Sequence, residues 1–162
     1  MQIGLAFMAE PEAQEKITAK LKQMFPDVDF KSRAVGSVDG AKSFLNETAG
    51  AVGYVMFNTI NEANASQIIL RSGKPVYAIA QSIPSSPMYV MDVIQAKKDG
   101  YPILSVVTEN IMDERVLLKV RYLVALAKVR SSKVLLVTTR SVSDYMNWAF
   151  PNSTDVWSIF WG

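Results

Sequence analysis

Short apolar runs alternate along this chain with longer segments whose apolar residues recur at helical spacing. The apolar run at residues 3–8, for example, leads through a short loop into a helical pattern at residues 13–25. Strands that are apolar on both sides are typical of parallel sheets, whose neighbouring strands are joined by helical crossovers. Since such crossovers are right-handed, they place helices on both faces of the sheet. The pattern predicts an α/β chain with a mostly parallel sheet.

The same alternation continues along the whole chain. Strands are predicted at residues 3–8, 27–35, 51–57, 74–80, 103–107 and 133–138. Helices are predicted at residues 13–25, 37–45, 61–71, 87–98, 112–130 and 144–150. The predicted architecture is a three-layer, doubly wound sheet of the flavodoxin-like or Rossmann-like kind.

The chain of 162 residues has the usual size of one domain, so a single α/β domain over residues 1–162 is expected. The aromatic tail at residues 155–162 has the pattern of one more strand, with no helix after it. Two interpretations stay open. The tail pairs at a sheet edge and buries Trp157 and Trp161, or these aromatic side chains dock on another subunit.

The residue types exclude several classes of function. The chain has no His and no Cys, which rules out a Ser-His-Asp triad, a thiolate nucleophile, disulfides and His-based metal sites within it. Its formal charge of +2 is scattered, so no basic block predicts nucleic-acid binding. No apolar run is long enough to predict a membrane span, and no export signal is visible, so a cytoplasmic location is expected. Whether the chain is an enzyme is left open, with a non-catalytic role favoured for the chain alone.

In open parallel sheets, ligands bind outside the carboxyl ends of the strands, near the point where the strand order reverses. That rule selects the loops at residues 8–12, 58–62, 81–86 and 138–143. The candidate ligand-binding residues in the two central loops are Asn58, Thr59, Asn61, Glu62, Gln81, Ser82, Ser85 and Ser86. Most of them offer both hydrogen-bond donors and acceptors, which suits the hydroxyl groups of a sugar or polyol. The alternative is that these residues are only helix caps and turn formers.

Nucleotide cofactors are disfavoured by what the loops contain. No G-x-G-x-x-G and no G-x-x-x-x-G-K-[ST] occurs, which argues against a dinucleotide site or a P-loop. A flavin phosphate would need several Ser and Thr residues after the first strand, but that loop contains Glu10, Pro11 and Glu12. No cofactor is expected for the chain alone.

Three segments of the sequence resemble the N-terminal domain of the L-fucose isomerase and L-arabinose isomerase superfamily. They are Gly53-Tyr-Val-Met-Phe-Asn-Thr-Ile-Asn-Glu62, Gly73-Lys-Pro-Val-Tyr-Ala-Ile-Ala80 and Ser85-Ser-Pro-Met-Tyr-Val-Met-Asp92. Residues 120–137 are similar to that family's long helix and the strand after it, so the resemblance covers about residues 50–140.

The resemblance implies an α/β first domain, an oligomeric protein and a sugar ligand. The family's manganese-dependent aldose–ketose chemistry uses Glu, Asp and His ligands supplied largely by later domains. Without any His, this chain cannot take over that metal site, and Mn²⁺ or Mg²⁺ would bind only if a partner supplied ligands. What the resemblance carries over is a polyol-facing role for Asn58, Thr59, Asn61 and Glu62, and for Ser82, Ser85 and Ser86.

The expected function is that of a carbohydrate-binding or assembly domain, without catalysis of its own, that forms a homo-oligomer. One alternative is a sugar isomerase subunit whose site is completed by a partner chain. Another is a structural homo-oligomerisation domain, for which the tail at residues 155–162 is the distinguishing feature.

Overall fold

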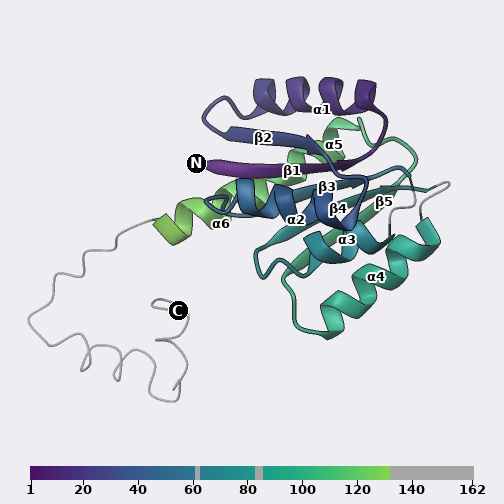
Figure 1. The fold of residues 1–162 in the computed structure, drawn as a ribbon. Helices are drawn as coiled ribbons and strands as arrows, with labels where there is room; N and C mark the ends of the chain where they lie inside the picture. The colour runs from purple at the N-terminus through teal and green to yellow at the C-terminus, as the bar shows by residue number, and fades with distance from the viewer. Residues whose placement is uncertain (61–62, 83–85, 132–162) are drawn as a thin grey trace, which may run out of the picture. The chain divides into compact units, whose positions relative to one another are not determined.

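The computed structural model describes residues 1–60, 63–82 and 86–131, which contain five parallel strands and the helices that connect them (Figure 1). The strands are β1 (Gln2–Met8), β2 (Asp29–Ala34), β3 (Tyr54–Asn58), β4 (Val76–Gln81) and β5 (Ile103–Thr108). The helices are α1 (Pro11–Met24), α2 (Val38–Glu47), α3 (Ala63–Leu70), α4 (Ser86–Lys98), α5 (Glu114–Leu117), the 3₁₀ turn η1 (Leu118–Val120) and α6 (Arg121–Ser131).

The strand order β2-β1-β3-β4-β5, with every neighbouring pair parallel, is that of flavodoxin-like folds. The predicted fold class is thereby confirmed. After β1 the chain moves outward to β2, then crosses back to β3 on the other side of β1. The point at which the strand order reverses therefore lies between β1 and β3.

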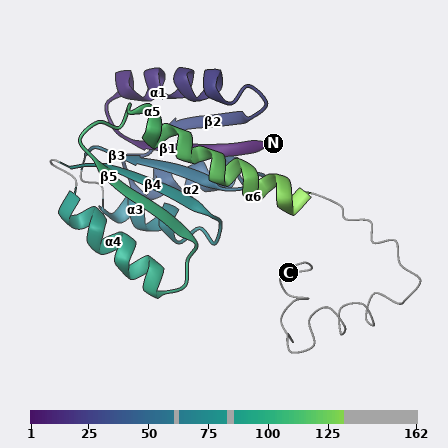
Figure 2. The ribbon, with the colours of Figure 1, turned by 180° about the vertical axis from the view of Figure 1, so that it is seen from behind.

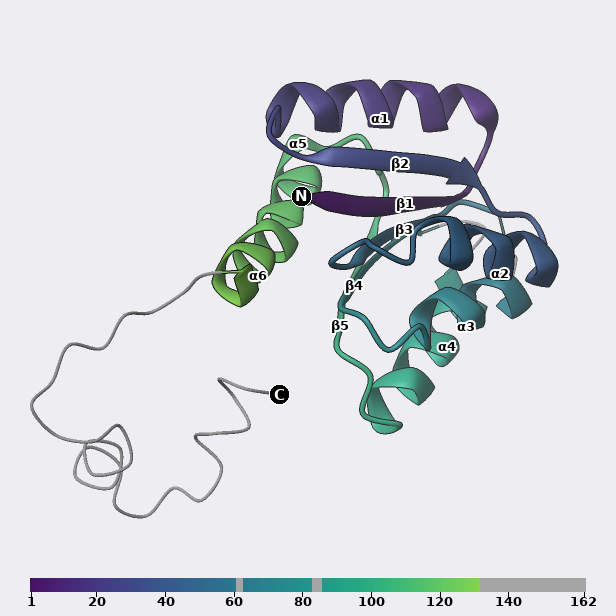
Figure 3. The ribbon, with the colours of Figure 1, turned by 60° about the vertical axis from the view of Figure 1, so that its left-hand side comes forward.

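Two apolar cores lie on opposite faces of the sheet. On one face, α1, α5, η1 and α6 cover side chains such as Leu5 and Phe57 (Figure 2). On the other face, α2, α3 and α4 cover side chains such as Met56 and Ala78 (Figure 3). Because β1, β3 and β4 send buried side chains to both cores, their sequences are nearly continuous apolar runs.

Local sequence signals set where several helices begin. Pro11 is the first residue of α1, so that helix starts two residues before the predicted segment, at a position where the missing proline N–H costs nothing. The Ser37 side chain accepts a hydrogen bond from the Gly40 N–H at 3.1 Å and caps α2. The Asp113 side chain caps α5 in the same way, through the Arg115 N–H.

The long continuous helix predicted at residues 112–130 is wrong in part, because α5 and α6 are separated by the 3₁₀ turn η1. Side chains three residues apart lie above one another in a 3₁₀ turn. Leu117 and Val120 are three residues apart. Both are fully buried in the apolar core on the face of the sheet that α1 covers. The end of α5 and the 3₁₀ turn thus both contribute a side chain to this core.

Residues Met1–Arg130 form one compact unit. The strand predicted at residues 133–138, the helix at 144–150 and the tail at 155–162 lie outside the described residues. The single domain over residues 1–162 and both interpretations of the tail therefore stay predictions. In the part of the chain that the structure describes, no helix is both long enough and apolar enough to cross a membrane.

We expect alkaline pH to weaken the fold through two buried tyrosines. Burial raises the pKa of Tyr77 and Tyr89 well above the usual 10.0. As the pH rises above 10.0, the tyrosine hydroxyls of the unfolded chain lose their protons before the buried ones of the folded chain do. The buried neutral tyrosines therefore contribute their full stability below pH 10.0, and this contribution is lost as the pH rises above that value. Tyr89→Phe should therefore reduce the fall in stability above that pH, as measured by urea unfolding at a series of pH values.

At neutral pH the same variant should lose about 1 kcal/mol, because the Tyr89 hydroxyl donates to the Ala78 carbonyl at 2.7 Å. Tyr122→Phe, on the exposed surface of α6, controls for the loss of a hydroxyl group alone. An identical decline in wild type and Tyr89→Phe above pH 10.0 would contradict the prediction.

Candidate functional site

The register of the sheet brings polar residues together at the carboxyl ends of β3, β4 and β5. Asn58 is the last residue of β3 and lies opposite Ala80 of β4. The next residue of β4, Gln81, lies opposite Thr108, the last residue of β5. Three adjacent strands thus end in neutral polar residues at the edge of the sheet where flavodoxin-like folds bind ligands.

The reversal point between β1 and β3 is tied together by hydrogen bonds. The Met8 carbonyl accepts hydrogen bonds from the backbone N–H groups of Thr59 and Ile60, at 2.9 and 3.1 Å. It also accepts one from the Thr59 hydroxyl at 3.3 Å. These contacts pull the loop after β3 onto the end of β1. The loop after β3 is therefore fixed against the end of β1 at the reversal point.

The predicted residues Asn58 and Thr59 differ in their access to solvent. Asn58 is buried, with 1% of its surface exposed, so its side chain lies beneath the surface of the site. Thr59 is half-buried, and its hydroxyl already donates to the Met8 carbonyl. That hydroxyl still has lone pairs that can accept a hydrogen bond from a ligand.

Gln81 and Ser82 stand next to the loop that follows β5. Both are half-buried, and the Ser82 N–H donates to the Thr108 carbonyl at 2.9 Å, which extends the pairing of β4 with β5. The backbone of Ser82 therefore lies beside that of Thr108. The structure begins α4 at Ser86, while Ser85 lies outside the described residues, as do Asn61 and Glu62.

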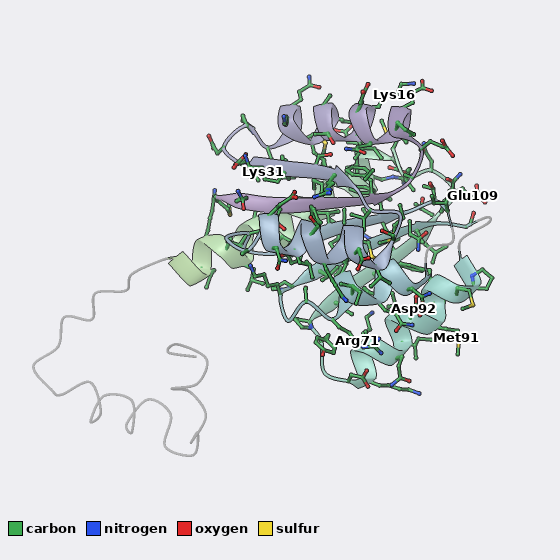
Figure 4. All side chains as sticks on the ribbon, viewed as in Figure 1. Lys16, Lys31, Arg71, Met91, Asp92 and Glu109 are labelled. Atoms are coloured by element: carbon green, nitrogen blue, oxygen red, sulfur yellow. The ribbon has the colours of Figure 1, made fainter. Side chains whose placement is uncertain are left out.

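The loop after β5 belongs to the same edge, although the sequence did not single it out. The Thr108 hydroxyl donates to the Asn110 carbonyl and accepts from the Asn110 N–H, both at 3.2 Å. The Asn110 side chain accepts from the Met112 N–H at 2.9 Å. Figure 4 shows Glu109 on the side toward which the strands point. Polar residues directly after an apolar strand were the signal that selected the other loops, and the same signal is present here.

The start of α1 makes the β1 end of this edge acidic. Glu10 precedes the helix without a capping hydrogen bond from its side chain, and Pro11 has no N–H to offer an anion. The Glu12 carboxylate accepts a hydrogen bond from Lys16 at 2.6 Å, which lowers the pKa of Glu12. The described part of the edge carries the exposed carboxylates Glu10 and Glu109, while the Glu12 carboxylate is paired with Lys16. The two exposed carboxylates disfavour an anionic ligand close to them.

Within residues 1–60, 63–82 and 86–131, no group of three or more Asp and Glu side chains is placed to hold a metal ion. Two surface grooves lie along the helices on the face of the sheet that α2, α3 and α4 cover. One, of about 560 Å³, runs between α2 and α3 beside Leu45 and Arg71. The other, of about 260 Å³, lies between α4 and β5 beside Ile94 and Val107. The loop predicted at residues 138–143 lies outside the described residues.

Comparisons with known proteins identify no relative of this chain. No protein-family model matches it, and neither a curated protein nor a solved structure is similar to it. The site must therefore be interpreted from its own geometry.

Proposed function

We propose that this chain is a non-catalytic carbohydrate-binding domain that holds a neutral sugar or polyol at the carboxyl ends of β3, β4 and β5. The observation that carries the proposal is the run of neutral polar side chains along this edge. Gln81 and Thr108 end neighbouring strands in register, and Ser82 follows directly. Amide and hydroxyl groups can each donate and accept, as the hydroxyl groups of a sugar do.

The charges around the edge support a neutral ligand. Glu10 is exposed on one side and Glu109 on the other, while Glu12 is paired with Lys16. These carboxylates would repel a phosphate or carboxylate group, but a carboxylate beside a sugar can accept hydrogen bonds from its hydroxyl groups. A neutral, hydroxyl-rich ligand therefore fits the edge better than a nucleotide or an acid.

We also propose a relationship to the N-terminal domains of the L-fucose and L-arabinose isomerase superfamily. It rests on the quoted sequence segments, and the α/β fold agrees with the first domain that the resemblance implies. Under this proposal the chain supplies sugar contacts, and any Mn²⁺ or Mg²⁺ would need ligands from a partner. The partner-completed isomerase subunit differs from the main proposal in that the partner's ligands would complete a metal site and make the assembly catalytic.

A structural homo-oligomerisation domain is the second candidate function. It is favoured by the apolar side chains that α4 leaves exposed, among which Met91 is 65% exposed. This candidate does not exclude sugar binding, because one domain can both self-associate and hold a ligand.

A thermal-shift screen of neutral aldoses, ketoses and polyols tests the main proposal. A ligand that binds only the folded chain adds about 2.7 kcal/mol at a hundredfold excess over its dissociation constant. For a chain of this size that corresponds to a rise in melting temperature of roughly 5–10 °C. We expect such a rise with a subset of neutral sugars and none with sugar phosphates, and we expect it without Mn²⁺. A rise that requires Mn²⁺ would favour the isomerase alternative.

Two serine variants localise the binding. Ser82→Ala removes one hydroxyl from the proposed site and should raise the dissociation constant of the active sugar about fivefold, since one lost hydrogen bond is worth about 1 kcal/mol. Ser43→Ala removes the same group from α2, where the hydroxyl bonds to Glu47, and should leave binding unchanged. Equal affinities in Ser82→Ala and wild type, or no response to any sugar, would refute the proposed site.

A further inference from the structure

Positive charge is concentrated on the last described helices, although single basic residues occur along the whole chain. Of the 17 basic and 15 acidic residues, residues 115–131 contain five basic ones and no acidic one. The 12 basic and 15 acidic residues elsewhere give the rest of the chain a formal charge of −3. The five cations are Arg115, Lys119, Arg121, Lys128 and Arg130. The positive net charge of the chain is therefore due to the stretch from α5 to α6.

The same stretch carries apolar side chains on two opposite sides. On the inner side, Val120 and Leu123 are buried in the core that α1 also covers. On the outer side, four apolar side chains are exposed at intervals of three or four residues: Leu118, Tyr122, Leu126 and Val129. Residues at this spacing share one face of a helix. Figure 2 shows α6 on the outside of this face of the sheet, with no other described element over it. We call these four residues the outer stripe.

Cations flank the outer stripe on both sides. At 3.6 residues per turn, Arg121 and Lys128 occupy positions on one side of the stripe. Lys119 and Arg130 occupy positions on the other side. The Arg121 guanidinium lies 5.5 Å from the centre of the Tyr122 ring, so cation and aromatic ring are adjacent on the surface. An apolar line between cations is typical of helices that lie in the surface of an anionic membrane.

Charge argues against other occupants of the outer stripe. A second copy would bring its own five cations against the first five if the same helices paired, and like charges repel. Residues 132–162 contain two basic and two acidic residues, so this segment offers no excess of negative charge. A nucleic acid would attract the cations through its phosphates but would offer no apolar surface to the stripe.

We propose that the outer stripe docks this chain on the surface of an anionic lipid bilayer. The aliphatic side chains of the stripe enter the boundary between headgroups and acyl chains, and the Tyr122 ring lies at the level of the headgroups. The flanking Lys and Arg side chains are long enough to reach lipid phosphates while their methylene groups stay beside the stripe. Because lipids adapt to the shape of the helix, this contact needs no preformed groove. The inner side of α6 stays packed on the sheet.

Surface plasmon resonance of the full chain on captured vesicles tests the docking. We expect binding to mixed vesicles of phosphatidylserine and phosphatidylcholine, and little binding to phosphatidylcholine alone. High salt should release the chain, because it screens the attraction between the cations and the lipid headgroups. The result is independent of the proposed sugar site, because no sugar is present in the measurement.

A pair of charge variants tests the flanking cations. Arg121→Gln combined with Lys128→Gln should weaken binding to the mixed vesicles about 25-fold, since each cation near an anionic surface is worth about fivefold. Lys97→Gln combined with Lys98→Gln removes the same charge from the last turn of α4 and should weaken binding far less. Equal losses in the two double variants would overturn the proposal, because net charge alone would then explain the binding.

A pair of apolar variants tests the outer stripe itself. Tyr122→Ser combined with Val129→Ser keeps all five cations but removes the most exposed side chains of the stripe, at 53% and 71%. Binding should weaken about tenfold, because less apolar surface leaves water. Met91→Ser, at a side chain of α4 that is 65% exposed, is the control and should bind like wild type.

Circular dichroism melts of each variant establish that it is folded. A folded wild-type chain that does not bind the mixed vesicles would overturn the proposal and leave an acidic protein as the alternative partner. Equal binding to both kinds of vesicle would also overturn it, since the cations would then play no part. So would full binding by the double variant at Tyr122 and Val129.

Discussion

Phe57→Ala lowers the free energy of unfolding by about 3–5 kcal/mol, because a buried phenylalanine side chain is replaced by a cavity. Phe57 is fully buried in β3, the middle strand of the sheet. Its ring stacks on that of Phe7 in β1, with centroids 4.6 Å apart and planes inclined by 6°. The strands on both sides are held by backbone pairing, so the surroundings can collapse only partly into the space left by the ring.

Urea unfolding followed by circular dichroism measures the loss. Met91→Ala is the control, because Met91 is 65% exposed and its truncation should change stability by less than about 0.5 kcal/mol. If Phe57→Ala cost as little as Met91→Ala, the position of β3 at the centre of the core would be wrong. Phe57→Leu should fall between the two, since it leaves a smaller cavity.

Asp92→Ala should destabilise the fold by about 2–4 kcal/mol, because it removes the charged acceptor of the buried Ser66 hydroxyl and of the half-buried Gln67 amide. Asp92 lies on α4 and is 7% exposed. Its carboxylate accepts hydrogen bonds from the Ser66 hydroxyl at 2.7 Å and from the Gln67 side-chain amide at 2.9 Å, both on α3. The carboxylate therefore joins α3 to α4 on one face of the sheet.

Asp99→Ala is the matched control, because it removes a more exposed carboxylate one residue beyond α4. Asp99 accepts from Arg71 at 3.2 Å, and the loss of such a surface ion pair should cost less than about 1 kcal/mol. A double-mutant cycle sharpens the test. Ser66→Ala combined with Asp92→Ala should cost less than the sum of the single variants, since the two side chains share a hydrogen bond. Additive losses would contradict a direct contact between them.

Much of the fold could be predicted from the sequence because β1, β3 and β4 are buried on both faces. Their nearly continuous apolar runs predict buried strands. The helical patterns between these runs predict the helical crossovers that connect parallel strands. The details that could not be predicted depend on tertiary packing. Nothing in residues 112–130 signals a 3₁₀ turn, since η1 is set by how Leu117 and Val120 meet the sheet. Pro11, by contrast, signals the first residue of α1 when it is recognised as the end of the loop after β1.

The candidate site could be predicted as a set of loops but not as a surface. Asn58 was expected in the loop after the third strand, but it is the buried last residue of β3, and the next residues, Thr59 and Ile60, fold back onto the Met8 carbonyl. That contact joins residues about fifty positions apart and leaves no local signal. The loop at Thr108 and Asn110 was missed for a different reason: its polar residues were visible, but only the strand order shows that β5 lies beside β4.

Backbone-amide NMR of the full chain, titrated with the sugar that gives the largest thermal shift, tests the central claim most directly. The amides of Thr59, Ser82, Thr108 and Glu109 lie at or beside the carboxyl ends of β3, β4 and β5. The account predicts that their resonances move together with a single dissociation constant, and that Thr18 in α1 and Ser43 in α2 stay in place. Resonances that move only in α1, α2 or the groove between α2 and α3, or no movement with any sugar, would contradict the proposed site.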